Sequence, residues 1–329
     1  MRLSPTWATR IALPIVVVLI LVGGLIFGLG HLEGKRPGTP RLTGTASPAR
    51  TRPTPSPEPH VLIIVEENQG YNSTQVDCGV DNSYFCLLAS EYASIVPWYG
   101  VTHPSLPNYL ALTSGSTQGC LSDGCPGPYA VDNLGHQLTQ AGIPWAAYME
   151  SMPTPCYRGL SLGEYAKKHD PFSFYSDLLD KGACAQHVLP YPGVSHLLSA
   201  LDATGSPDYV WITPNLLDDM HDGTLAQGNA WLQANLGPVL SSPWFTRFQS
   251  TVIVTDDEND DQPTGSCCDD AAGGQIPELV ISRKARGRAA ISITGDQYGT
   301  LRSIEETFRL PLLGAAAEAS NGDLLSLFG

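Results

Sequence analysis

The chain has 329 residues, of which 32 are acidic and 18 are Lys or Arg, so its formal net charge is −14 at pH 7. The charge is unevenly distributed: the first 59 residues carry a net charge of +5, and the remaining 270 carry −19. A domain as acidic as this second part lacks the basic surface that binds phosphate backbones, so we expect no nucleic-acid partner.

An uncharged apolar stretch of twenty residues, IALPIVVVLILVGGLIFGLG, occupies residues 11–30. As a helix it would be about 30 Å long, enough to cross the hydrocarbon core of a bilayer. We therefore expect a transmembrane anchor or uncleaved signal at 11–30, preceded by a cytoplasmic N-terminus at 1–10; a cleaved signal peptide is the alternative. Residues 31–59 are rich in Pro, Thr, Ser and Arg and predict a disordered tether.

All the cysteines of the chain follow the apolar stretch. They are the eight residues Cys78, Cys86, Cys120, Cys125, Cys156, Cys184, Cys267 and Cys268. An even number of cysteines after a targeting segment indicates disulfides and an oxidising compartment. We therefore expect the chain beyond the anchor to lie outside the cytoplasm, held to the membrane by the N-terminal helix, with secretion as the alternative. Cys78 and Cys86 are close enough in the chain for a local bridge.

Residues 60–329 are expected to form one domain. Short apolar runs predict five buried strands, at 60–67, 144–150, 208–214, 250–258 and 277–283. Helical patterns alternate with them near 133–142, 193–203, 224–240 and 299–308. Strands that are apolar throughout and separated by helices are typical of a mostly parallel sheet covered on both faces, so the predicted fold class is α/β.

The stretch THPSLPNYLALTSG, residues 102–115, predicts a helix with an unusual start. Apolar residues recur at helical spacing, and Gly115 ends the pattern. Ser105 stands at the beginning, between two prolines. It can serve as a helix cap, or its hydroxyl can act as a nucleophile towards an anionic group held at the helix N-terminus. This pattern leaves both interpretations open.

Polar clusters follow three of the predicted strands, where ligands bind in parallel sheets. They are Glu66, Glu67 and Asn68; Asn215, Asp218, Asp219, His221 and Asp222; and Asp256, Asp257, Glu258, Asn259, Asp260 and Asp261. Each cluster alone could be a solvated loop. If they converge, their carboxylates repel one another unless a divalent cation neutralises them. A metal beside a hydroxyl nucleophile is suited to phosphoester hydrolysis.

Six motifs occur in the order found in the phosphoesterase family of bacterial acid phosphatases and phospholipases C, which this chain resembles. They are VEENQGY, THPSLPNYLALTSG, EYAKKHDPF, TPNLLDDMHDGTLAQGNAWL, IVTDDEND and LRSIEETFRLPLLG. The resemblance extends from residue 60 to about residue 314. It implies the alkaline-phosphatase-like fold, a doubly wound α/β sandwich with a mostly parallel central sheet. The apolar stretch at 11–30 lies outside the resemblance, and with it the expected location is a bacterial cell membrane.

The resemblance also implies the residues of a metal site. Glu67 and Asn68 match the metal-binding pair after the first strand, and Asp257 and Glu258 match the pair after a later strand. Relatives with two metals carry a histidine where this chain has Gln297, so the resemblance implies one divalent metal ion per chain, of unknown identity.

Further residues receive catalytic and substrate-binding roles from the same motifs. The nucleophile is Ser105, with Thr102 as the rival hydroxyl. Catalytic roles at the phosphate or the leaving group fall to three residues, His221, Asp219 and His103. Substrate binding falls to Lys168, His169 and Asn133, although Lys168 and His169 could instead be an ordinary exposed pair.

These inferences predict an extracytoplasmic, metal-dependent phosphomonoesterase of the acid phosphatase type that works through a phosphoserine. Its substrate would be a phosphorylated small molecule or a phosphoinositide-like lipid. A phosphodiesterase of the phospholipase C type is one alternative, and a non-catalytic surface module of the same fold is another.

Overall fold

The computed structural model describes residues 59–76, 83–180, 182–260, 266–268 and 271–329. The expected N-terminus, apolar stretch and nearly all of the tether lie outside this part. Within the described ranges, no helix has the length and apolar character needed to span a membrane.

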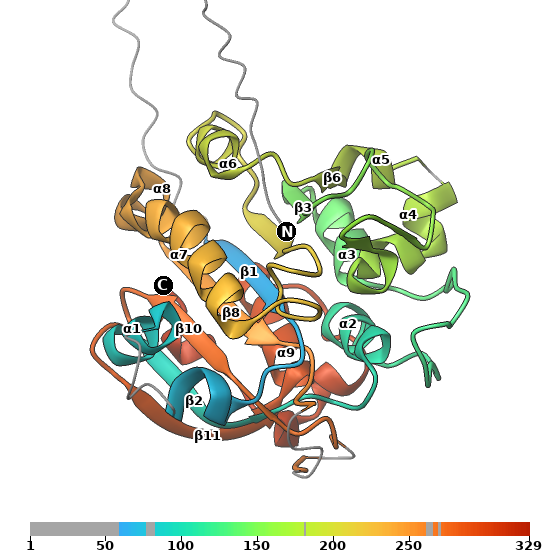
Figure 1. Ribbon diagram of the computed structural model, residues 1–329. Helices are drawn as coiled ribbons and strands as arrows, with labels where there is room; N and C mark the ends of the chain where they lie inside the picture. Colours follow the sequence, from blue (N-terminus) through green and yellow to red (C-terminus); the bar gives the residue numbers. More distant parts are fainter. Residues whose placement is uncertain (1–58, 77–82, 181, 261–265, 269–270) are drawn as a thin grey trace, which may run out of the picture. The chain divides into compact units, whose positions relative to one another are not determined.

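A nine-stranded sheet organises the domain (Figure 1). Its order is β11-β2-β10-β8-β1-β7-β3-β6, and β9 pairs with β2. These strands are β1 (His60–Glu66), β2 (Ala93–Tyr99), β3 (Trp145–Met149), β6 (Val188–Pro190), β7 (Tyr209–Thr213), β8 (Ser250–Asp256), β9 (Gln275–Ile276), β10 (Glu278–Ser282) and β11 (Ala290–Asp296). A separate two-stranded sheet joins β4 (Ser161–Leu162) to β5 (Tyr165–Ala166).

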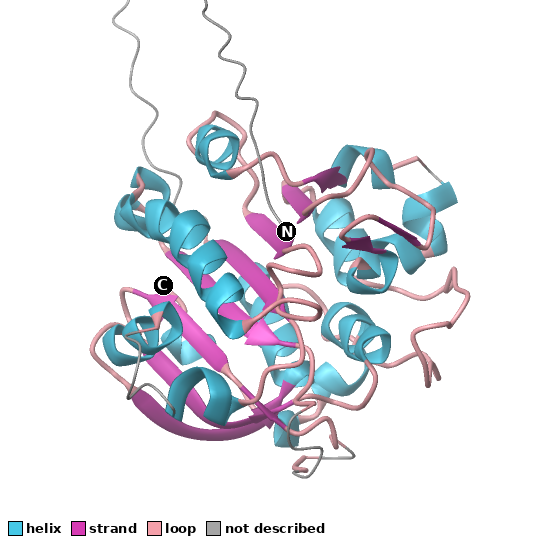
Figure 2. Cartoon of the chain, viewed as in Figure 1, coloured by secondary structure: helices cyan, strands magenta, loops and turns pink. Residues whose placement is uncertain are grey.

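Helices cover both faces of the large sheet, as Figure 2 shows. The α-helices in the described ranges are α1 (Tyr84–Glu91), α2 (Ser105–Ser114), α3 (Leu134–Ala141), α4 (Ser176–Asp180), α5 (Cys184–His187), α6 (Val194–Leu201), α7 (Leu225–Ser241), α8 (Pro243–Arg247) and α9 (Gln297–Phe308). One face packs against α2, α3 and α9. The other packs against α1, α6, α7 and α8. All five predicted strands and the predicted helices are present.

The α/β class and the mostly parallel sheet are confirmed. β1 runs parallel to both β7 and β8, and β3 runs parallel to β7, so their carboxyl ends meet at one edge. Strand β10 differs, because it is antiparallel to both β8 and β2. Successive side chains of a strand point to opposite faces. Val65 accordingly packs on the α2 face, whereas Ile64 packs on the α7 face.

Helix α2 lies in the core with all its residues buried. It ends at Gly115, whose φ of 69° is left-handed. A Cβ at this position would lie 2.0 Å from the carbonyl oxygen of Leu313, so only glycine fits the close approach. The N–H of Ala315 donates to the carbonyl of Gly115 at 2.9 Å. The C-terminal end of α2 is thereby joined to the segment that follows α9.

Disulfides are present among the described cysteines, as predicted. They join Cys120 to Cys125, Cys156 to Cys184, and the adjacent pair Cys267 and Cys268. Cys78 lies outside the described ranges, so the local bridge to Cys86 stays a prediction.

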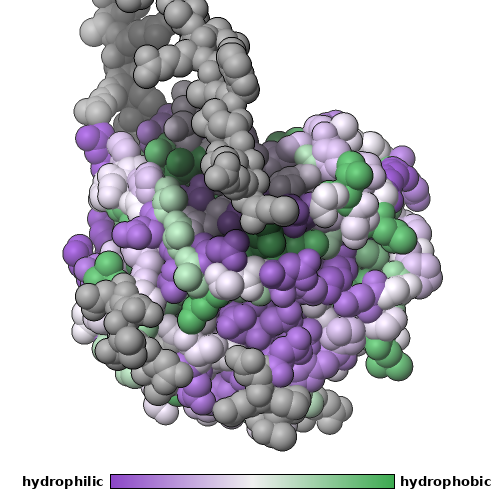
Figure 3. Space-filling view, in the orientation of Figure 1, coloured by the Kyte–Doolittle hydropathy of each residue, from purple (hydrophilic) through white to green (hydrophobic). Residues whose placement is uncertain are grey.

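The face of the molecule drawn in Figure 3 is largely hydrophilic, with small separate hydrophobic areas.

Candidate active site

A cleft of about 500 Å³ lies at the carboxyl edge of the sheet. Its walls come from the loops after β1, β7 and β8, from the start of α2, from the loop that carries Asp123 and from the short 3₁₀ helix Lys167–His169. The lining residues are Asn68, His103, Pro104, Ser105, Asp123, Lys168, His221, Glu258 and Asp260. Six of the predicted site residues therefore share one cleft.

Ser105 is the first residue of α2 and is 2% exposed. The helix cap is Pro104, so the Ser105 hydroxyl is not used for capping. Its Oγ donates towards two carboxylates, at 3.1 Å to Glu67 Oε2 and 3.3 Å to Glu258 Oε1. Lys168 Nζ donates to the same Oγ at 3.3 Å. The hydroxyl thus lies between two acids and one cation.

Thr102, the rival hydroxyl, is not among the residues that line the cleft. Its Oγ1 donates to the carbonyl of His103 at 3.3 Å, and its N–H donates to Asn108 Oδ1 at 2.8 Å. His103 lines the cleft and contacts the Glu258 carboxylate through Nδ1, with Asp260 Oδ1 3.8 Å away. His103 is therefore placed beside the acids that surround Ser105.

Two of the predicted metal ligands, Glu67 and Glu258, contact the same hydroxyl, and Asp257 lies next to Asn68 and Glu258. Asp257 is fully buried, and its Oδ1 accepts from the backbone N–H of Asn68 at 3.0 Å and of Glu258 at 2.8 Å. Its Oδ2 has no hydrogen-bond partner in the described part of the chain. Burial and the negative charges of Glu67 and Glu258 raise the pKa of Asp257 well above its usual value. Burial and the neighbouring Asp260 and Glu67 raise the pKa of Glu258 to about 8.

Glu67 differs from these acids because His169 faces it. His169 Nε2 lies 2.9 Å from Glu67 Oε1, and Nδ1 lies 3.1 Å from Asp219 Oδ2. Burial opposes charge on both groups, but the attraction between them lowers the pKa of Glu67 to about 2 and, with Asp219, raises that of His169 to about 9. His169 is 3% exposed and is not among the residues that line the cleft, and it lies between Glu67 and Asp219.

Asp219 and His221 lie on either side of Met220 in the loop after β7. Asp219 is buried, and besides His169 it accepts from the backbone N–H of His221 at 2.8 Å. His221 Nδ1 lies 2.8 Å from Asp222 Oδ1, and Nε2 lies 3.0 Å from Lys168 Nζ. An ammonium group only donates, so Nε2 is the acceptor and Nδ1–H donates to Asp222. Asp219 therefore holds His169 and His221, and of these three residues only His221 reaches the cleft.

Two predicted positions have other roles. Asn133 does not line the cleft; its Oδ1 caps α3 by accepting from the N–H of His136 at 3.0 Å. Gln297 is buried, and its Nε2 donates to the carbonyls of Asp256 and Asp257 at 3.2 and 2.6 Å. Its Oε1 accepts from the N–H of Val101 at 3.1 Å. Gln297 thus joins the acidic loop after β8 to the segment that leads to Ser105.

Sequence reasoning missed two residues of the site. Asp123 lines the cleft and lies 3.0 Å from Lys168 Nζ through Oδ2. Tyr109 is buried in α2, and its hydroxyl donates to Glu67 Oε1 at 2.6 Å. The helical spacing that identified Tyr109 as a core residue gives no information on where its hydroxyl points.

Two sets of possible metal ligands flank Ser105, each with ligand atoms within 4.8 Å of one another. One is Glu67, His169 and His221, and the other is His103, Glu258 and Asp260. Carboxylate and imidazole donors of this kind suit a divalent cation. The unpartnered Oδ2 of buried Asp257 is a further oxygen donor. The residues present therefore fit a divalent metal ion.

The sequence GLSLG at 159–163 matches the Gly-x-Ser-x-Gly pattern of serine esterases. In those enzymes the serine lies on a sharp turn between a strand and a helix. Ser161 instead belongs to the exposed strand β4 of the two-stranded sheet. Ser161 therefore does not lie on the turn that carries the nucleophile of serine esterases.

Comparison with known proteins identifies the family of the chain. The model of the phosphoesterase family matches residues 79–311. A phosphatidylinositol-3-phosphatase of Mycobacterium tuberculosis is 31% identical over 79% of this chain and 80% of its own. A probable acid phosphatase of Kluyveromyces lactis is 26% identical over 77% of this chain, and the match spans 59% of that protein.

Solved structures agree with the fold. A protein of the alkaline phosphatase superfamily from Vibrio parahaemolyticus has a TM-score of 0.52 at 10% identity, covering 76% of this chain and 66% of its own. The lipoteichoic acid synthase LtaP from Listeria monocytogenes has a TM-score of 0.54 at 9% identity, covering 80% and 76%. The mixed α/β fold is therefore similar to the folds of these two structures. From the family match and the acid phosphatase relatives, the chain belongs to the phosphoesterase family and is a phosphatase hydrolase.

Proposed function

We propose that the chain is a metal-dependent phosphomonoesterase that works through a phosphoserine at Ser105. The observation that carries this proposal is the position of Ser105 Oγ in the cleft, between two carboxylates and the Lys168 ammonium. The hydroxyl is at the N-terminus of α2, where the partial positive charge of the helix favours an anionic group.

In the first step, Ser105 Oγ attacks the phosphorus of a phosphate monoester. The Oγ–P bond forms as the bond between phosphorus and the leaving alcohol oxygen breaks, and the leaving oxygen takes a proton from water. The hydroxyl proton passes to a carboxylate, for which Glu67 Oε2 at 3.1 Å is the nearer acceptor. In the second step, water cleaves the Oγ–P bond, which releases inorganic phosphate and restores the serine.

Cationic and donor groups stabilise the charge that develops on the phosphoryl oxygens. Lys168 supplies a positive charge next to Ser105, and His221 faces the same cleft through Nε2. His103 also lines the cleft, against Glu258. We assign Lys168 and His103 to binding the phosphoryl group, and His221 to the leaving-group oxygen.

Glu67, Asn68, Asp257 and Glu258 would hold the divalent metal ion, with His103, His221 and Asp260 close enough to contribute. When bound, the metal lowers the pKa of the attacking hydroxyl and balances charge on the transferring group. The support for this proposal is the concentration of buried carboxylates and the unpartnered Asp257 Oδ2. The acid phosphatase relatives support the hydrolysis of phosphate esters and give no information on a metal.

The substrate we propose is a phosphate monoester, either of a small molecule or of a phosphoinositide-like lipid. The similarity to the mycobacterial phosphatidylinositol-3-phosphatase supports the second class. The test is hydrolysis of 4-nitrophenyl phosphate against bis(4-nitrophenyl) phosphate, each with and without a chelator. We expect the monoester to be hydrolysed faster and the chelator to stop it. Faster hydrolysis of the diester would favour the phospholipase C type, and no hydrolysis of either would favour a non-catalytic module.

We also propose that residues 11–30 anchor the domain to the outer side of a bacterial cytoplasmic membrane, or that the domain is secreted. The apolar stretch and the disulfides of the domain support this proposal. Protease added to spheroplasts should release the domain by cutting in the tether. A domain that stays protected in intact spheroplasts, with its cysteines as free thiols, would contradict the proposal.

A further inference from the structure

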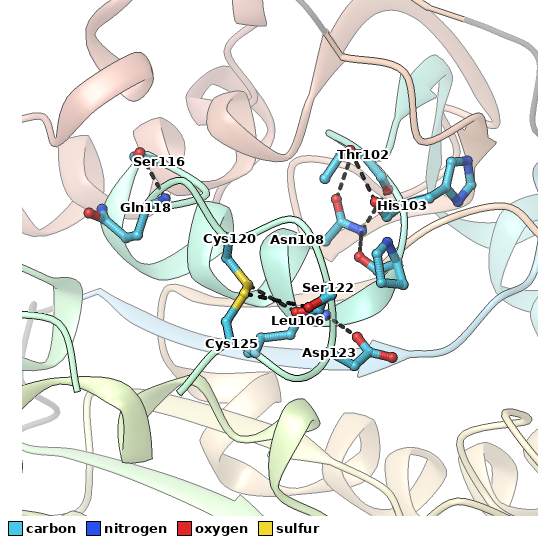
Figure 4. Close-up of a disulfide and its surroundings, with 11 residues drawn as sticks. Thr102, His103, Leu106, Asn108, Ser116, Gln118, Cys120, Ser122, Asp123 and Cys125 are labelled. Carbon is cyan, nitrogen blue, oxygen red and sulfur yellow. Dashed lines mark hydrogen bonds between the residues drawn. A yellow bond between two sulfur atoms is a disulfide. The ribbon is translucent and has the colours of Figure 1, made fainter. Parts of the chain in front are cut away.

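Asp123 joins the two parts of the site that bear on Ser105. Its Oδ1 accepts from the backbone N–H of Leu106 at 3.0 Å, and its Oδ2 lies 3.0 Å from Lys168 Nζ. Figure 4 shows its carboxylate directed at Leu106, in the first turn of α2. Pro104 provides no side-chain cap for this helix, so Asp123 does so from 17 residues beyond Leu106.

The Lys168 ammonium has three partners for its three N–H groups. They are Asp123 Oδ2 at 3.0 Å, His221 Nε2 at 3.0 Å and Ser105 Oγ at 3.3 Å. Of these three, only Asp123 carries a negative charge, and a charged partner makes the strongest of such hydrogen bonds. Lys168 is a flexible side chain with four rotatable bonds. Asp123 is therefore the one charged hydrogen-bond partner that fixes the direction of Lys168, while the charge of Glu67 also attracts the ammonium group.

The loop that carries Asp123 is closed by the Cys120–Cys125 disulfide. Cys120 is buried in the core, and Cys125 packs against it. Between them, the large apolar residue is Leu121, which is 84% exposed and so does not fix the loop by packing. Covalent closure takes the place of packing here, because it limits the conformations that four small or exposed residues can adopt.

From these contacts we propose that Asp123 is a positioning residue: it aligns Lys168 with Ser105, and the Cys120–Cys125 disulfide is required to hold it there. The proposal rests on the proposed function, because it assigns Lys168 to the phosphoryl group. It makes the activity of the enzyme dependent on oxidation of one disulfide, which fits an enzyme that works in an oxidising compartment.

The first test compares Asp123→Asn with a control, Asp132→Asn. Both remove one carboxylate charge, and Asp132 is likewise paired with a nearby cation-forming side chain, His136, but does not line the cleft. We expect Asp123→Asn to lower kcat about 10- to 100-fold, as loss of a supporting contact does in other active sites. Its melting temperature should stay near that of wild type, because Asn caps helices as well as Asp. Asp132→Asn should keep the wild-type kcat.

A double-mutant cycle with Lys168→Met separates positioning from a general structural effect. If Asp123 acts through Lys168, Asp123→Asn will cause no further loss of kcat in the Lys168→Met background. Independent losses that multiply would overturn the proposal. So would an Asp123→Asn variant with the wild-type kcat.

The second test concerns the disulfide. Cys120→Ser/Cys125→Ser should lower kcat by about the same factor as Asp123→Asn, and adding Asp123→Asn to it should have little further effect. A disulfide variant that is folded by circular dichroism and fully active would overturn the requirement for the disulfide, as would a full additional loss on adding Asp123→Asn. Wild-type protein with no activity on any phosphoester would contradict the proposed function instead, which keeps the two failures distinct.

Discussion

Tyr109 donates its hydroxyl hydrogen to Glu67 Oε1 at 2.6 Å, and both residues are fully buried. The acceptor belongs to the carboxylate whose other oxygen faces Ser105. Removing this donor in Tyr109→Phe should lower the free energy of unfolding by about 1.5–3 kcal/mol, because the hydrogen bond is made to a charged group. We also expect kcat to fall about 10-fold, since the Glu67 carboxylate loses a group that holds it in place.

The matched control is Tyr175→Phe. Tyr175 is equally buried, and its hydroxyl is hydrogen-bonded to Thr113 Oγ1 at 2.6 Å. Thr113 belongs to α2, like Tyr109, but this hydrogen bond does not involve Glu67. Steady-state kinetics and urea unfolding should show a loss of stability for both variants and a loss of kcat for Tyr109→Phe alone. Equal kinetic effects would argue against a role for Tyr109 in holding Glu67.

Ser105→Ala tests the nucleophile. Removal of the attacking hydroxyl should lower kcat by about 10³-fold or more, a barrier increase of about 4 kcal/mol, with fold and metal content unchanged. Thr102→Val is the control and should cost much less, because Thr102 lies outside the cleft lining. Rapid quenching with labelled substrate should place phosphate on the peptide that contains Ser105. A label on Thr102 or His103 would move the nucleophile to that residue.

Asp257→Asn tests the metal site. Asp257 presents a buried oxygen with no partner among the described residues, and its pKa is raised by burial and by Glu67 and Glu258, so a cation would relieve this repulsion. We expect the variant, like Glu67→Gln, to lose both bound metal, measured by elemental analysis, and activity. Full activity of wild type after exhaustive chelation, with no metal found, would refute metal dependence.

Glu278 gives a prediction on stability and pH. It is fully buried in β10, and burial raises the pKa of its carboxyl from 4.5 to about 8. Between about pH 4.5 and pH 8 this carboxyl keeps its proton in the folded protein and has lost it in the unfolded chain. Its contribution to the free energy of unfolding therefore falls as pH rises through this range. Glu278→Gln removes this dependence. Its stability relative to wild type should rise by the order of a few kcal/mol between pH 4 and pH 9.

Urea unfolding at several pH values measures this effect. Glu318→Gln is the control: Glu318 is exposed, so its carboxyl faces water in the folded and the unfolded chain, and the variant should follow the wild-type curve. A constant difference between Glu278→Gln and wild type at all pH values would show that Glu278 does not hold a proton in the folded state.

The central part of the fold was predictable because its strands are buried on both faces. Every residue of β1 and β8 is buried, and their apolar runs stand out from the surrounding loops. Strand β11 was missed because it lies at the edge of the sheet and its first residues are exposed or half-buried. The antiparallel direction of β10 was not predictable, since a short apolar run carries no signal for direction.

The site shows the same division. Ser105, Glu67 and Glu258 stood out in the sequence because they begin a predicted helix or lie at the end of a predicted strand, and the topology brings such positions to one edge. Their predicted roles came from the resemblance to the phosphoesterase family and not from these positions. Asp123 was missed, because in a loop of small and polar residues an aspartate is typical of a turn. Its contact with Lys168 joins residues 45 positions apart and depends on how a disulfide loop folds back.

The close approach of Gly115 to Leu313 and Gly314 has a consequence for protein engineering. A chain shortened after residue 313 would keep every residue that lines the cleft, yet the last turn of α2 would lose its bond to Ala315. A tag attached directly after residue 313 would lie next to Gly115, where this contact is made. Variants shortened from the C-terminus should therefore be tested for phosphatase activity as well as for yield, because α2 carries Ser105.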